Sequence, residues 1–146
     1  MSAIYRRNVT VPTSAIDENG HLNNVTYVQW MQEVAIAHAN HTTCTRETNA
    51  VGATWVIRSH RIDYLKPTFE GEQIAVFTWI ANIRKVRSQR KYCFFRPADQ
   101  TVLATGKTDW IFVNAQTGRP MSIPQTVADA FEVITEDINP KSLSIQ

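Results

Sequence analysis

The spacing of apolar residues divides the chain into one strand, one long helix and a series of further strands. Residues 3–12 alternate between apolar and polar positions, which predicts a strand that ends at Pro12. From about residue 25 to about residue 40, apolar residues recur at intervals of three and four, which predicts a helix with one buried side. That side is expected to hold Tyr27, Val28, Trp30, Met31, Val34, Ala35 and His38.

The second half of the chain has the pattern of an antiparallel sheet. Runs rich in β-branched and aromatic residues cover residues 55–65, 74–83, 87–95 and 102–113. Short turns separate these runs, and strands joined in this way pair as antiparallel neighbours. Two further segments complete the pattern: residues 40–51 are predicted to form a polar loop with room for one helical turn, and residues 126–133 a short helix.

We expect a single domain. A chain of 146 residues is long enough for one hydrophobic core and too short for two ordinary domains. The predicted domain covers residues 1–136, and the polar residues 137–146 are predicted to form a loosely ordered tail. Several strands are apolar on both faces, so we expect a second copy of the chain to cover the outer face of the sheet.

Composition and charge restrict the classes of function. The formal net charge of +2 argues neither for a nucleic acid nor for a membrane surface as partner. The first residues become polar too early for a signal peptide, and no apolar run is long enough to span a bilayer. We therefore expect a cytoplasmic protein in which Cys44 and Cys93 are reduced.

The densest group of chemically active side chains lies directly before the predicted helix. Residues 17–27 read Asp-Glu-Asn-Gly-His-Leu-Asn-Asn-Val-Thr-Tyr. The first turn of a helix has N–H groups without partners inside the helix, and the helix dipole adds to their attraction for negative charge. A polar cluster at this position is suited to stabilise negative charge that develops on a substrate.

The order of the predicted elements resembles the hotdog fold. This is an α+β fold in which an antiparallel sheet of about five to six strands wraps around one long central helix. The specific residues resemble the acyl-CoA thioesterases of the 4-hydroxybenzoyl-CoA thioesterase type over about residues 4–131. They are Asp17-x-x-Gly20-His21-x-Asn23-Asn24-x-x-Tyr27, Ile62-Asp63-Tyr64-Leu65-Lys66-Pro67, Gly71-Glu72, Arg119-Pro120 and Ile123-Pro124. The first segment also resembles the plant acyl-(acyl carrier protein) thioesterases, in which one chain contains two hotdog units.

The resemblance implies that the protein hydrolyses an acyl thioester to a free acid and a thiol. Asp17 would act as nucleophile or general base, unless it is a loop or cap residue. The backbone N–H of Asn24, or of a neighbour, would bind the oxyanion. His21 would orient Asp17, hold the loop or act as the base itself. Asn19 would position a water molecule, and the side chains of Asn23 and Asn24 would satisfy backbone groups of the loop.

Four further residues are expected to bind the substrate. Tyr27 and Trp30 lie on the apolar side of the helix, where core packing is the ordinary interpretation. The acyl pocket of the resembled fold lies beside this helix, so they would also set the acyl chain length. Arg87 and Ser88 belong to the basic run 84–91. This run is either a solvated hairpin or a docking surface for coenzyme A phosphates or an acidic acyl carrier protein.

The expected partners are an acyl-CoA or acyl-ACP substrate and a second copy of the chain, as a homodimer that continues to a homotetramer. We expect no nucleic acid, membrane, metal or other cofactor; His38, His41 and Cys44 lack a fourth ligand at a suitable spacing. Two alternatives stay open. One is an enoyl-CoA hydratase of the same fold, although the Asp–His spacing here is one residue shorter. The other is an acyl-CoA-binding protein without turnover.

Overall fold

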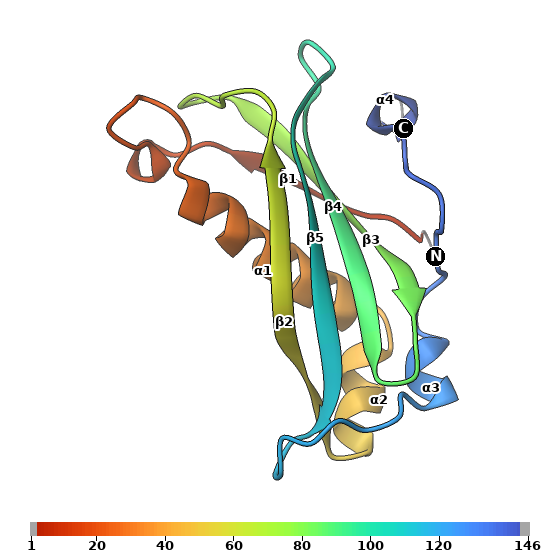
Figure 1. Cartoon of the computed structure of the whole chain (residues 1–146). Coiled ribbons are helices and arrows are strands. Elements are labelled where there is room, and N and C mark those ends of the chain that lie inside the picture. Colours follow the sequence, from red (N-terminus) through yellow and green to blue (C-terminus); the bar gives the residue numbers. More distant parts are fainter. Residues whose placement is uncertain (1–2, 144–146) are drawn as a thin grey trace.

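The computed structural model describes residues 3–143, in which a five-stranded antiparallel sheet wraps around one long helix (Figure 1). The strands lie in the order β1-β3-β4-β5-β2. Their bounds are β1 (Tyr5–Thr10), β2 (Ala53–Tyr64), β3 (Gln73–Ile83), β4 (Arg87–Arg96) and β5 (Thr101–Asn114). Each strand lies within about two residues of the run predicted for it. Strands β1 and β2 are the two edge strands of the sheet.

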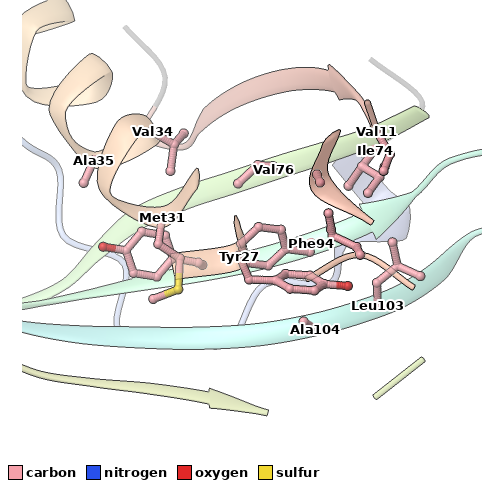
Figure 2. Packing of buried hydrophobic residues seen from close by; sticks show 13 residues of the cluster. Val11, Tyr27, Met31, Val34, Ala35, Ile74, Val76, Phe94, Leu103 and Ala104 are labelled. Carbon is pink, nitrogen blue, oxygen red and sulfur yellow. The ribbon is translucent and has the colours of Figure 1, made fainter. Parts of the chain in front are cut away.

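Helix α1 (Asn24–His41) packs its apolar side on the inner face of the sheet. Figure 2 shows side chains of α1, among them Met31, against Phe94 of β4 and Ala104 of β5. The helix can approach closely because residue 106 of β5 is a glycine. A Cβ atom at Gly106 would lie 3.1 Å from Cε of Met31 and 3.3 Å from the carbonyl oxygen of Arg61. A side chain at position 106 would therefore require Met31 to shift.

Two of the predicted segments differ from the structure. The segment predicted as a loop contains helix α2 (Cys44–Ala50), whose buried residues are Cys44 and Thr48. Only these two positions of a short polar sequence face the core, so periodicity could not reveal the helix. The helix predicted for residues 126–133 is the single turn α3 (Gln125–Ala128). Helices α2 and α3 lie together at the far end of α1 (Figure 1).

The C-terminal segment covers part of the outer face of the sheet. Buried side chains from β3 and β4 form a second apolar cluster there: Ala75, Phe77, Trp79, Cys93 and Phe95. Ile134 and Ile138 pack against this cluster, and Lys91 forms an ion pair with Asp137 at 2.9 Å. The expectation that a second copy must cover this face is therefore wrong for the β3–β4 half, which the chain covers itself.

The end of the chain is described as far as helix α4 (Pro140–Leu143). The last residues of the predicted tail, 144–146, lie outside the described residues, and the domain boundary after residue 136 stays a prediction. Within residues 3–143, no helix is long and apolar enough to cross a membrane.

Candidate active site

A tight loop holds Asp17 next to the first turn of α1. Ile16 and Leu22 pair as an isolated antiparallel bridge, and the N–H of Asp17 donates to the carbonyl of His21 at 2.8 Å. Gly20 closes the turn with a φ of 76°, in the left-handed region that favours glycine. The loop lies next to the helix because Asn23, directly before α1, donates its N–H to the carbonyl of Ala15 at 2.8 Å.

Main-chain groups fix one oxygen of the Asp17 carboxylate. Its Oδ1 accepts the N–H of Asn19 at 2.9 Å and the N–H of His21 at 3.1 Å. Among the described residues, no group donates a hydrogen bond to Oδ2. Asp17 is half-buried, so this second oxygen can meet a ligand or a water molecule. Asp17 therefore caps main-chain groups of its own loop and not of α1. Its second oxygen remains available.

Within the described chain, α1 has an open donor at its first residue. Asn23 is the N-cap, and its Oδ1 accepts the N–H of Val25 at 2.8 Å. Its carbonyl accepts the N–H of Thr26 at 3.0 Å. The N–H of Asn24 has no hydrogen-bond partner in the part of the chain that the structure describes. The open donor is thus at the residue from which oxyanion binding was expected.

The side chains of Asn19 and His21 do not contact Asp17 through hydrogen bonds within residues 3–143. Both residues reach its carboxylate through their main-chain N–H groups. The imidazole of His21 instead packs edge-on against Phe69, with ring centroids 5.3 Å apart. Asn19 is exposed at the tip of the loop. The main chain of His21, and not its imidazole, thus supports the Asp17 carboxylate.

Tyr27 and Trp30 occupy the core side of α1. Tyr27 is buried, and its hydroxyl shares a hydrogen bond of 2.8 Å with Thr68. Its ring lies edge-on to those of Tyr64 and Phe94, and burial raises the pKa of its hydroxyl. Trp30 is half-buried and packs against the same cluster. Core packing, the ordinary interpretation, describes both residues in the single chain.

The basic run 84–91 does not form one charged surface. Arg84, Lys85 and Arg87 are exposed at the turn between β3 and β4. Ser88 is buried and donates its hydroxyl to the carbonyl of Asn82 at 2.8 Å. Arg90 is also buried, with 3% of its surface exposed. Alternation along β4 separates these residues, because Ser88 and Arg90 face inward and Arg87 faces outward.

A cleft of about 290 Å³ lies beside the second half of α1, away from Asp17. Helices α2 and α3 and the inner face of the sheet complete its walls, which include Ala35, Trp55, Ile80, Ser88, Arg90 and Val127. In the sequence, Arg90 is distinguished only as a member of the basic run 84–91. Strand alternation nevertheless predicts that Arg90 faces inward, because it is two and four residues from the large inward residues Tyr92 and Phe94.

Comparisons with known proteins give a family and a fold. The model of the family described as the thioesterase-like superfamily matches residues 11–131. No curated protein matches the chain. Among solved structures, YbaW, a probable thioesterase from Escherichia coli, is similar with a TM-score of 0.80 and 12% identity, over 86% of this chain and 95% of that chain.

Two further structures are similar over most of this chain. Slr0204, a 1,4-dihydroxy-2-naphthoyl-CoA thioesterase from Synechocystis, has a TM-score of 0.76 and 17% identity over 87% of this chain and 94% of that one. The 12:0-ACP thioesterase from Umbellularia californica has a TM-score of 0.82 and 18% identity, over 93% of this chain and 54% of that one. These similarities confirm the expected hotdog fold.

Proposed function

Because the chain belongs to the thioesterase-like superfamily, we propose that it hydrolyses an acyl thioester to a free acid and a thiol. One observation carries the assignment to particular residues. A half-buried carboxylate with one available oxygen, Asp17, lies next to a helix start whose first N–H, that of Asn24, is open. A base or nucleophile beside an oxyanion donor is the arrangement that acyl transfer to water requires.

In the proposed reaction, the carbonyl oxygen of the thioester points at the N–H of Asn24. Asp17 Oδ2 either takes a proton from a water molecule that attacks the carbonyl carbon, or attacks that carbon itself. In both cases, the tetrahedral intermediate has its negative oxygen at the start of α1, and its collapse breaks the carbon–sulfur bond. The leaving thiolate becomes the thiol by taking a proton, from Asp17 in the first route and from the hydrolytic water in the second. If Asp17 attacks, water then hydrolyses the acyl-aspartyl anhydride. The two bonds to Oδ1 keep the carboxylate oriented throughout.

We propose a homodimer as the working form. Strand β2 lies at the edge of the sheet, and its neighbourhood exposes Val56 together with Val25 and Ile36 of α1. Antiparallel pairing of two β2 strands would place the two α1 helices side by side in opposite directions. The start of one helix would then face the second half of the other, where the cleft lies. A homotetramer would require a further contact.

We further propose coenzyme A or an acyl carrier protein as the thiol carrier and the cytoplasm as the place of reaction. Arg84, Lys85 and Arg87 are exposed at the turn between β3 and β4, next to Ile83 and Ser88 of the cleft wall. Cations at this position suit the phosphates of coenzyme A or the acidic surface of a carrier protein.

A thiol-release assay tests the reaction. Short, long and aromatic acyl-CoAs and acyl carrier substrates are offered to the wild type, to Asp17→Asn, and to the control Glu18→Gln, which changes the exposed carboxylate next to Asp17 in the same loop. We expect Asp17→Asn to reduce the rate of thiol release about 10²–10³-fold, as the removal of one oxyanion donor does. Its circular dichroism spectrum should be unchanged. Equal turnover by Asp17→Asn would contradict the assignment.

The same samples separate the two alternatives. A hydratase would change the absorbance of crotonyl-CoA without releasing a thiol. A binding protein would retain acyl-CoA without either change.

A further inference from the structure

Arg90 is a buried cation for which the described chain provides no anion. None of the ion pairs within residues 3–143 includes Arg90. Its Nη1 donates to Nδ1 of His38 at 2.9 Å and to Oγ1 of Thr78 at 3.0 Å. Both acceptors are uncharged: burial and the nearby Arg90 charge lower the pKa of His38 to about 3.

The guanidinium remains charged at neutral pH. Burial lowers the pKa of Arg90 to about 10, which still leaves it protonated in the cell. The centroid of the Phe131 ring lies 5.4 Å from Cζ of Arg90, and this contact gives partial compensation. Buried guanidinium groups are normally paired with carboxylates, because an unpaired charge in a dry interior is strongly unfavourable. Within residues 3–143, no carboxylate balances the charge of Arg90.

Arg90 lies in the wall of the cleft beside α1, and the remaining wall is mostly apolar. Arg90 is the one charged residue among the described residues that line the cleft. A cavity of this kind fits a ligand with a hydrocarbon or aromatic body and a negatively charged acceptor.

We propose that this cleft binds the acyl group of the substrate and that Arg90 selects acyl groups that carry a carboxylate remote from the thioester. The substrate class would be mono-thioesters of dicarboxylic acids or of carboxylated aromatic acids. The inference rests on the proposed function, in which Asp17 of one subunit acts on a thioester whose acyl group enters the cleft of the other.

The kinetic test compares acyl-CoA pairs of equal chain length that end in a carboxylate or in a methyl group, such as adipoyl-CoA and hexanoyl-CoA. We expect the wild type to have a kcat/KM about tenfold or more higher for the carboxylated member of each pair. The reason is that the methyl-ended substrate would leave the buried Arg90 without a partner. Arg90→Met should reverse this preference, Arg90→Lys should retain part of it, and Arg61→Met, which removes an exposed cation of β2, should leave it unchanged.

Binding of free ligands separates this inference from hydrolysis. Octanoate should raise the melting temperature of the wild type more than octanamide does, and Arg90→Lys should reduce the difference. Thiol release without discrimination within the pairs, together with equal effects of octanoate and octanamide, would overturn the role of Arg90 and leave hydrolysis standing. A shift specific to octanoate without thiol release from any substrate would support the anion site and reject the proposed function. If Arg90→Met does not fold, the wild-type comparisons and Arg90→Lys decide.

Discussion

The Asp17 carboxylate is held by main-chain N–H groups, so its position does not depend on neighbouring side chains. His21 contributes its main-chain N–H to this arrangement, while its ring packs on Phe69. The sequence alone could place Asp17, His21 and the amides in one loop. It could not separate a base from a loop-supporting residue, because that depends on which atom of His21 faces the carboxylate.

His21→Ala is predicted to retain activity within about tenfold of the wild type, since loss of a general base would cost about 10²–10⁴. The N–H that binds Asp17 Oδ1 remains in this variant. Steady-state thiol release, with Asp17→Asn measured in parallel, checks the prediction. Loss as large as that of Asp17→Asn would show that the imidazole itself transfers the proton.

His38 predicts a dependence of stability on pH. In the folded chain, burial and the charge of Arg90 lower its pKa to about 3, from 6.5. Between these values the unfolded chain binds the additional proton, so the free energy of unfolding falls as the pH falls from 6.5 toward 3. His38→Gln should show a shallower decrease between pH 6.5 and pH 5, where few carboxylates titrate. Urea unfolding at several pH values measures this slope. His60→Gln, at a less buried histidine whose pKa burial also lowers, serves as the comparison and should change the slope less.

Arg90 illustrates what sequence reasoning missed at the residue scale. Most of the other residues in the run 84–91 are cationic, so the run as a whole indicated a solvated or docking surface. The strand period of two is what directs Arg90 inward, beside His38 and Thr78. A charged residue at an inward position contradicts the hydrophobic pattern, and such a contradiction is typical of a functional position.

At the scale of elements, the fold was largely predictable because its strands and α1 are long and regular. The five strands and the central helix follow from period two and period 3.6. Helix α2 does not follow from either period, because contacts of Cys44 and Thr48 with other elements stabilise it. Trp55, for example, donates its indole N–H to Thr48 at 3.2 Å.

The N-cap of α1 gives a prediction at this scale. Asn23→Ala removes the acceptor for the N–H of Val25 and is expected to lower the free energy of unfolding by about 1 kcal/mol. Asn23→Asp preserves the acceptor and should restore the stability. Asn24→Ala changes an exposed side chain one position later and should stay within about 0.5 kcal/mol of the wild type. Urea denaturation measures the free energy of unfolding of the three variants. Equal values for all three would show that the Asn23 cap does not contribute to stability.

At the scale of the whole molecule, the two faces of the sheet are covered by different means. Helix α1 covers the inner face, and the segment that contains Ile134 and Ile138 covers the β3–β4 half of the outer face. The sequence showed that both faces need cover. It could not show that the chain itself supplies part of it, because the last residues are polar and contribute few apolar side chains.

Two isoleucines test this division. Ile138→Asp places a charge against the outer cluster and should lower the free energy of unfolding by about 1–3 kcal/mol. Ile36→Asp, on the exposed side of α1, should leave the stability of the monomer nearly unchanged and weaken association. Urea unfolding at low protein concentration and light scattering measure the two effects. Undisturbed association of Ile36→Asp would argue against the proposed dimer face.

The burial of both thiols makes the protein a convenient carrier for reporter groups. Cys44 and Cys93 are buried, and burial raises the pKa of each, that of Cys93 to about 12. Maleimide dyes should therefore attach to a newly introduced surface cysteine and leave the native pair unmodified. A single fluorophore near the turn between β3 and β4 would then follow acyl-ligand entry in real time, without first removing any native residue.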